Sequence, residues 1–213
     1  MLHSNTCRAR WPITQNAGGR PQAAPFDRVH ATCAVARVPY AWVEQTRPGG
    51  VIVTPYAPGF GSSHELRLVV LPGGTAVGRC TGHASYMMMR SQRHPAWDGP
   101  RSGGAVSTTD IDSRTISYAP AGADLAMGAA LPGVQAHHDG PTYTLRLWSP
   151  DAWATATYRP DSADYTVEQS GDRPLWDQAT TAYFAWIAHG SPGRDRFTLT
   201  VTPDGDRVHL DRA

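Results

Sequence analysis

The pattern of apolar and polar positions is clearest between residues 25 and 56, where it predicts a strand, a helix and a second strand. The first strand covers residues 28–33, an alternating run that is too short for a helix. The helix begins at Pro39, whose ring fixes a helical φ and whose missing N–H is not needed at that position. It ends at Arg47, because a proline and two glycines follow, and residues 51–55 form the next strand. Crossovers of this kind are nearly always right-handed, so we expect the two strands to be parallel neighbours.

From residue 65 onward the pattern predicts a mainly antiparallel region. Residues 65–71 and 75–80 alternate around a Pro-Gly-Gly turn and predict a hairpin that points Leu66 and Leu68 inward. One long amphipathic helix is expected, over about residues 174–188. Further strands are expected over residues 114–118, 142–148, 153–158, 197–201 and 207–210.

Other segments carry no clear period. Residues 1–22 and 94–109 are polar and contain glycine and proline, so we expect loops there. Residues 86–93 predict a short helix or strand, whose three methionines we interpret as core and not as the lining of a substrate groove. Gly59-Phe60-Gly61 precedes a strand-like run and not a helix, so we interpret it as a plain loop and not as a phosphate-binding loop.

The composition is that of an ordinary globular protein, with 213 residues, 40% hydrophobic and 17% charged, and its 21 glycines and 18 prolines indicate many turns. A formal net charge of +1 provides no strong field for nucleic acid or an anionic membrane. No stretch approaches the roughly 20 apolar residues of a membrane span. The three cysteines have no C-x-x-C spacing, so we expect neither disulfides nor a zinc site, and a reducing cytoplasm fits best.

Two short constellations are weak candidates for chemistry. Residues 137–139, His-His-Asp, contain metal-ligand types, but adjacent histidines in a strand point to opposite faces, and the nearby glycine and proline favour a solvated loop. Residues 61–64, Gly-Ser-Ser-His, lack the strand, turn and helix that surround a hydrolase nucleophile. No metal site is therefore expected.

Two segments resemble adjacent motifs of the protein-L-isoaspartate O-methyltransferase family: residues 25–34 (PFDRVHATCA) and residues 45–53 (QTRPGGVIV). The start of the 174–188 helix at Leu175, its Trp186 and the final hairpin resemble the extra C-terminal domain of actinobacterial members of that family. The resemblance thus extends over nearly all of residues 25–213, with weaker matches between residues 95 and 140.

The resemblance implies a fold and a division of the chain. We expect the C-terminal part of a Rossmann-like α/β methyltransferase sheet, followed by a mainly antiparallel α+β domain. The expected division is an unstructured or non-native leader over residues 1–22, a methyltransferase remnant over 23–60 and a β-rich substrate-recognition domain over 61–213.

The resemblance also implies a reaction, methyl transfer from S-adenosylmethionine to an aspartate-derived carboxylate of a protein or a modified peptide. Thr32, Cys33, Ala34 and Pro39 would then line the substrate side, although burial for packing is an equal alternative for Cys33. No protein nucleophile is required, so no catalytic residue is assigned. Open α/β sheets hold such a cofactor with a Gly-rich loop and an acidic residue, and neither is found here, so no cofactor-binding residue is assigned. We therefore expect a truncated chain, inactive alone, or alternatively a non-catalytic peptide-binding module derived from such an enzyme.

Overall fold

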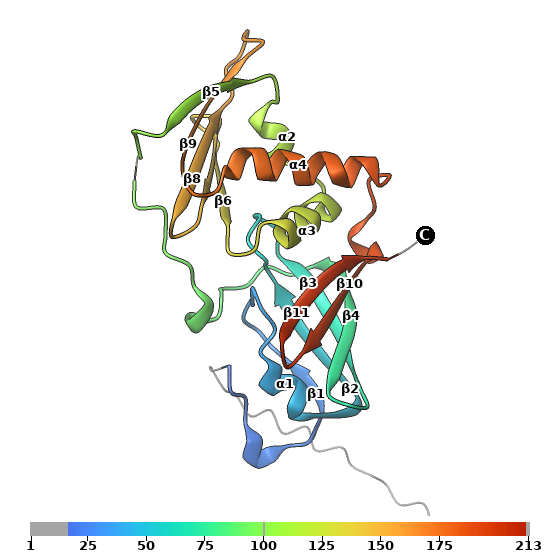
Figure 1. The fold of residues 1–213 in the computed structure, drawn as a ribbon. Coiled ribbons are helices and arrows are strands. Elements are labelled where there is room, and N and C mark those ends of the chain that lie inside the picture. Colours follow the sequence, from blue (N-terminus) through green and yellow to red (C-terminus); the bar gives the residue numbers. More distant parts are fainter. Residues whose placement is uncertain (1–16, 100, 212–213) are drawn as a thin grey trace, which may run out of the picture.

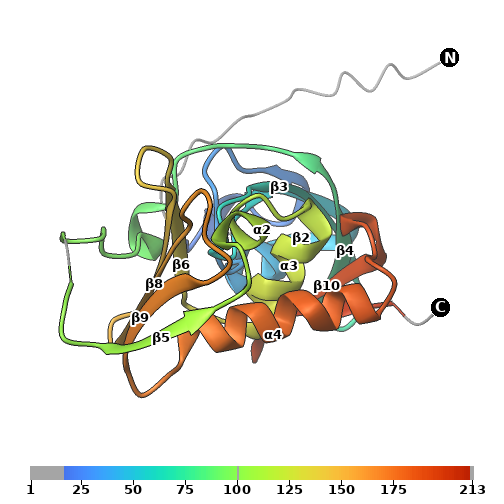
Figure 2. The ribbon, with the colours of Figure 1, turned by 90° about the horizontal axis from the view of Figure 1, so that it is seen from above.

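Two β-sheets with helices between them form the protein, as a computed structural model of residues 17–99 and 101–211 shows (Figure 1). The first sheet has six strands in the order β1-β2-β3-β4-β10-β11, and the second has five in the order β5-β9-β8-β7-β6. Helix α3 (Ala121–Ala130) packs on α4 (Leu175–Ala188) and on β11, while α4 also packs on the second sheet. Seen from above, α3 covers the strands of the first sheet, and α4 runs from the second sheet toward β10 (Figure 2).

The predicted strand, helix and strand open the first sheet. Strand β1 (Phe26–His30) pairs in parallel with β2 (Thr46–Tyr56), Val29 lying beside Ile52, which confirms the predicted parallel pair. Helix α1 (Tyr40–Glu44) connects them and begins directly after Pro39.

The helix is shorter than predicted, because the chain enters the sheet before Arg47. The N–H of Phe26 donates to the carbonyl of Gln45 at 2.7 Å, so β2 already starts at Thr46. Residues 48–50, the proline and two glycines that were expected to follow the helix, instead form the irregular start of this strand. Gly50 is required there, because a Cβ would lie 2.8 Å from the carbonyl oxygen of Arg47.

The first sheet continues without a break across residue 60. Antiparallel strands β3 (His64–Leu71) and β4 (Thr75–His83) form the predicted hairpin, and Leu66 and Leu68 are fully buried as expected. Strand β3 pairs with β2, and β10 pairs with β4. The final hairpin, β10 (Phe197–Thr202) with β11 (Gly205–Leu210), therefore joins the sheet that the N-terminal segment begins. The predicted boundary after residue 60 thus falls between two paired strands.

The second sheet differs more from the prediction. Its strands are β5 (Ala105–Thr109), β6 (Gln135–Asp139), β7 (Thr144–Trp148), β8 (Ala152–Thr157) and β9 (Tyr165–Gly171). The strands expected over residues 142–148 and 153–158 correspond to β7 and β8. The loop expected over residues 94–109 was wrong at its end, because β5 pairs with β9. The loop expected at residues 137–139 was also wrong, because these residues lie in β6 and pair with β7.

The strand expected over residues 114–118 was wrong, because α2 (Ser113–Ser117) lies there. A carboxylate oxygen of Asp112 accepts the N–H of Arg114 at 2.8 Å and caps this helix. The β-branched residues inside α2 suggested a strand, but the side-chain cap at Asp112 stabilises a helix there instead.

Parts of the expected leader and of the methionine run lie against the first sheet. The side chain of Gln45 donates to the carbonyl of Gly18 and accepts the N–H of Arg20, ahead of the short 3₁₀ helix η1 (Pro21–Ala23). The rest of the leader, residues 1–16, lies outside the described residues. Met89 is buried, as expected for core, whereas Met87 is 80% exposed. Residues 86–93 contain one 3₁₀ turn, η2 (Arg90–Gln92).

Candidate functional site

The segment that follows β1 holds the predicted substrate-side residues. Thr32 is exposed, Cys33 is partly buried against the core, Ala34 is buried, and Pro39 caps α1. The backbone of Ala34 pairs with the methionine run, donating to Met87 and accepting from Met89. Burial raises the pKa of the Cys33 thiol, so this thiol is a poor nucleophile.

Gln92 holds the next turn of the same segment. Its Oε1 accepts the N–H groups of Ala36 and Arg37 at 2.8 and 2.9 Å, and its Nε2 donates to the carbonyl of Arg37 at 2.7 Å. Three hydrogen bonds with one side-chain amide hold the backbone here, and none of them involves the side chain of Arg37. No described carboxylate forms an ion pair with Arg37.

This turn forms one wall of a cleft of about 690 Å³. The other walls come from the end of β2, α3, the residues before β6 and the turn between β10 and β11. The cleft is lined by Ala36, Arg37, Tyr56, Pro58, Gln92, His94, Gly128, Ala129, Pro132, Gly133 and residues 204–208. The cleft therefore lies where the N-terminal segment meets the C-terminal hairpin. None of Thr32, Cys33, Ala34 and Pro39 lines it, although Ala36 and Arg37 follow closely in sequence.

Two polar side chains form the floor of the cleft. Tyr56 is only 5% exposed, and burial raises its pKa well above the usual range, with a further contribution from the charge of Asp206. Asp206 is half-buried, and its Oδ2 accepts the N–H of Val38 at 3.3 Å. Burial also raises the pKa of Asp206. Sequence reasoning missed both residues, because they lie in different hairpins and no local motif contains them.

A second polar cluster lies deeper, between β3 and α3. His64 and Asp124 have side chains 0% and 3% exposed, and Nε2 of His64 lies 2.8 Å from Oδ2 of Asp124. Nδ1 of His64 lies 3.5 Å from Arg194 in the 3₁₀ helix η3 (Arg194–Arg196). Because a guanidinium only donates, Nδ1 accepts and the imidazole proton sits on Nε2. Oδ1 of Asp124 accepts the N–H of Ser62 at 3.2 Å. Burial raises the pKa of Asp124.

This cluster is closed. Both ring nitrogens of His64 and both oxygens of Asp124 have partners within the protein, and Arg194 also donates to the carbonyl of Gly82. We interpret it as a structural cluster that joins the first sheet to α3, because no atom of the pair is left to act on a substrate.

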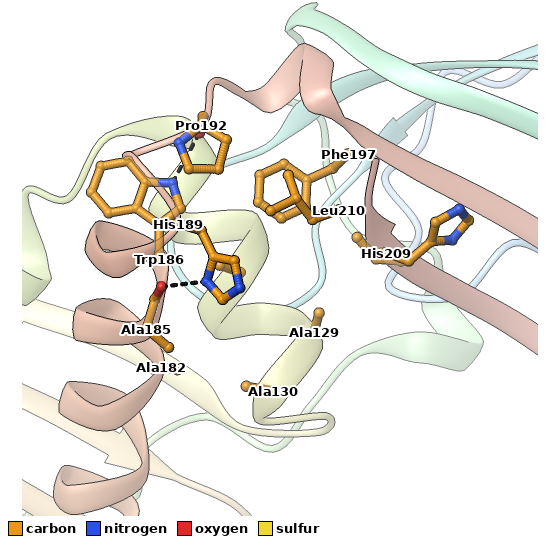
Figure 3. Close-up of a pocket in the computed structure, with 12 residues that line it drawn as sticks. Ala129, Ala130, Ala182, Ala185, Trp186, His189, Pro192, Phe197, His209 and Leu210 are labelled. Carbon is orange, nitrogen blue, oxygen red and sulfur yellow. Dashed lines mark hydrogen bonds between the residues drawn. The ribbon is translucent and has the colours of Figure 1, made fainter. Parts of the chain in front are cut away.

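A smaller pocket of about 350 Å³ lies between α3, α4 and the final hairpin (Figure 3). Alanines, Trp186, Phe197 and Leu210 make it mainly apolar. The indole N–H of Trp186 donates to the carbonyl of Pro192 at 2.9 Å, and His189 contacts the carbonyl of Ala185 at 2.6 Å (Figure 3). Few polar groups converge there, so it offers less for recognition than the cleft does.

Packing explains the glycine that the sequence offered as a weak candidate for a phosphate-binding loop. Gly59 lies in the loop between β2 and β3, where a Cβ would meet the carbonyl oxygen of Val134 at 2.2 Å. Close packing therefore explains this glycine, and a strand follows it. The described ranges contain no group of three or more His, Cys, Asp or Glu suited to a metal ion. In β6, Nδ1 of His138 lies 3.1 Å from the hydroxyl of Tyr118. Within the same ranges, no helix is long and apolar enough to cross a membrane.

Comparison with known proteins identifies the N-terminal segment. Residues 13–92 match the sequence model of the protein-L-isoaspartate(D-aspartate) O-methyltransferase family. The protein-L-isoaspartate O-methyltransferase of Paramagnetospirillum magneticum is 40% identical over 65 residues, which are 30% of this chain and 28% of that protein. Protein-L-isoaspartate O-methyltransferase 1 of an Anaeromyxobacter species is 47% identical over 60 residues, 27% of each chain. The chain thus spans less than a third of these relatives.

A solved structure of a protein-L-isoaspartate O-methyltransferase aligns with 92% of this chain and 57% of its own, at 14% identity and a TM-score of 0.42. The assignment rests on the sequence matches. The matched segment begins inside the expected leader, which corrects the expectation that residues 1–22 lie wholly outside the family, and it continues past the expected boundary to η2. Over this segment, residues 13–92, the chain is similar to the protein-L-isoaspartate O-methyltransferase family.

Proposed function

We propose that this chain supplies the peptide-binding side of a protein carboxyl O-methyltransferase, and that the cleft holds the peptide whose carboxylate is methylated. The observation that supports this proposal is the position of the cleft. The family segment contributes Arg37 and Tyr56 to it, and the C-terminal hairpin contributes Asp206. Arg37 offers a guanidinium at the rim of the cleft that forms no ion pair with a described residue, and a guanidinium binds carboxylates well.

The proposed role needs positioning and not a protein nucleophile, because the carboxylate of the acceptor is itself the nucleophile. The protein has to hold this carboxylate in one orientation and keep water away from it. Gln92 holds the turn that carries Arg37, so the guanidinium is presented from a fixed backbone. We propose that Thr32, Cys33, Ala34 and Pro39 line the neighbouring end of β1 on the acceptor side.

Members of the family use S-adenosylmethionine, and the described residues do not fit this cofactor. In the described part of the chain, no Gly-rich loop lies between a strand and a helix, where α/β sheets hold the polar groups of such ligands. We propose that the chain alone does not bind the cofactor appreciably. Calorimetric titration with S-adenosylhomocysteine should show no micromolar site, and one such site would contradict this part of the proposal.

A second candidate, a peptide-binding module without catalysis, is favoured by the same lack of fit to the cofactor. Methyl transfer separates the two. The chain is incubated with radiolabelled S-adenosylmethionine and an isoaspartyl peptide, with and without the nucleotide-binding half of a relative. Base-labile methyl esters formed only when that half is added support the acceptor-side role. No ester under either condition, together with peptide binding, supports the module.

Peptide binding tests what both candidates share. A fluorescent isoaspartyl peptide and its aspartyl isomer are titrated with the full chain, and binding is followed by anisotropy. We expect saturable binding that favours the isoaspartyl form, since the family name specifies this acceptor. Equal affinity for the two isomers would contradict the assignment of the substrate.

A further inference from the structure

We propose that Tyr56 and Asp206 form a polar floor that binds an amide N–H of the peptide, so that the start of β11 helps to determine specificity. The proposal rests on the proposed function, and it adds a specific contact and a second element to the site. Asp206 lies beyond residue 92, where the family match ends.

The hydroxyl of Tyr56 lacks a partner among the described residues. Within these residues, the only fully buried side-chain nitrogen or oxygen without a partner is Nε2 of His138. The hydroxyl of Tyr56 is therefore not sealed inside the core and reaches the cleft that this residue lines. A Tyr ring with 95% of its surface covered presents its polar end to the cleft, which is a common way to place one hydrogen-bonding group in a ligand site.

Asp206 faces the same cleft with spare acceptor capacity. A carboxylate has about four acceptor positions, and the Val38 N–H at 3.3 Å occupies one of them. Its fixed partner is backbone, so the carboxylate stays in place when side chains around it move. The Tyr56 hydroxyl feels the charge of Asp206, which supports their proximity.

The chemistry of the floor selects a donor. A half-buried carboxylate repels the carboxylate of a ligand and accepts an N–H, and a phenol hydroxyl accepts one too. The rim contains two guanidinium groups, from Arg37 and Arg207, together with His94 and Asp204. A peptide that places an N–H on the floor and a carboxylate near Arg37 provides a partner for the acceptors of the floor and for the guanidinium of the rim. An isoaspartyl residue contains these two groups next to each other.

N-methylation of the peptide tests the floor directly. A series of isoaspartyl peptides, each with one N-methylated amide, is titrated with the wild type, Tyr56→Phe and Asp206→Asn. We expect one position at which N-methylation weakens wild-type binding about tenfold. We expect both variants to bind the unmodified peptide several-fold more weakly and to lose most of the sensitivity at that position, because the contact is already removed.

Tyr40→Phe is the matched control, because the hydroxyl of Tyr40 donates to the carbonyl of Gly74 at 2.9 Å and lies outside the cleft. It should keep the full sensitivity to N-methylation. Urea denaturation shows that each variant is folded. The floor is overturned if no amide position is sensitive, or if both variants keep the wild-type sensitivity.

The outcomes for the floor and for the proposed function are separable. One outcome is that aspartyl and isoaspartyl peptides bind equally, while both variants lose the sensitivity to N-methylation that the wild type shows. This outcome refutes the isoaspartyl peptide as the substrate and supports the floor as a binding site. The opposite outcome is a preference for the isoaspartyl peptide while both variants keep the wild-type sensitivity to N-methylation. It refutes the floor as a binding site and supports the isoaspartyl peptide as the substrate. Absence of any peptide binding refutes both.

Discussion

Two polar clusters connect the family segment to the rest of the chain, and they differ in whether their hydrogen bonds are complete. His64, Asp124 and Arg194 are joined within the protein and leave no atom of the His–Asp pair unpaired. Tyr56 and Asp206 retain unused capacity and face a cleft. A closed cluster stabilises the fold, whereas an open cluster gains its partners from a ligand. The difference supports the proposal that the cleft is the functional surface and that the buried pair is a structural one.

Removing a partner from the closed cluster should have the largest effect. Asp124→Ala leaves the buried ring nitrogen of His64 and the N–H of Ser62 without acceptors. Each buried donor left without an acceptor costs about 1–3 kcal/mol, so we expect a loss of about 2–6 kcal/mol in the free energy of unfolding, measured by urea denaturation. Asp27→Ala, which breaks the exposed pair with Arg47, should leave the free energy nearly unchanged. Equal losses in both variants would remove the distinction between a buried and an exposed pair.

Removing the guanidinium at the rim should affect binding and not folding. Arg37→Met keeps the backbone bonds to Gln92 and removes the proposed charge-assisted contact with the peptide carboxylate. We expect a loss of affinity of about tenfold or more, measured by anisotropy, with an unchanged midpoint of unfolding. Arg67→Met, at an exposed position of β3 outside the cleft, is the control and should bind like the wild type. Unchanged affinity in Arg37→Met would exclude Arg37 from the carboxylate site.

Replacing Tyr40 or Tyr56 by phenylalanine tests the difference between closed and open polar groups through the free energy of unfolding alone. Tyr40→Phe removes a hydrogen bond made within the protein and should cost about 1 kcal/mol in the free energy of unfolding. Tyr56→Phe removes a hydroxyl that has no described partner, so it should cost nothing or slightly stabilise the free protein. A loss for Tyr56→Phe as large as that for Tyr40→Phe would show that the hydroxyl of Tyr56 already has a structural partner.

The smallest expected effect is the pH dependence of stability that arises from Asp206. Burial raises the pKa of Asp206 in the folded protein above its unfolded value, so the folded state holds this proton more tightly. The resulting stabilisation is present below the unfolded pKa and is lost as the pH rises through the folded pKa. Asp206→Asn keeps an acceptor for the N–H of Val38 and cannot ionise. We expect its stability relative to the wild type to rise as the pH increases above about 4, measured by urea denaturation. A pH-independent difference would contradict the raised pKa of Asp206.

The individual strands and the helix that open the first sheet were predictable because their signals are local. A short alternating run predicts β1, and Pro39 predicts the start of α1. The turn at residues 72–74 predicts the β3–β4 hairpin, so each signal lies within a few residues of its element. The second sheet was harder. Strand β5 is a polar segment that becomes a strand by pairing with β9, far along the chain. Helix α3 consists mainly of alanine and glycine, so its apolar face has little contrast with the rest.

The sequence predicted the region in which the candidate site lies, but not the residues that line it. The motif at residues 25–34 pointed to the end of β1, and the cleft begins a few residues later, at Ala36. Tyr56 and Asp206 meet there because β10 pairs with β4 and thereby brings the last hairpin into the first sheet. A pairing between distant strands leaves no trace in either local sequence, so the floor of the cleft required the structure.

The location of peptide binding tests the central claim most directly. Amide resonances of the full chain are recorded by NMR with and without the isoaspartyl peptide. The account predicts that the largest shifts cluster around the cleft, at Ala36, Arg37, Tyr56 and Asp206, and that the amide of His64 in the closed cluster changes little. Shifts centred instead on the apolar pocket, at Ala185 and its neighbours, or no shifts at the cleft, would contradict it.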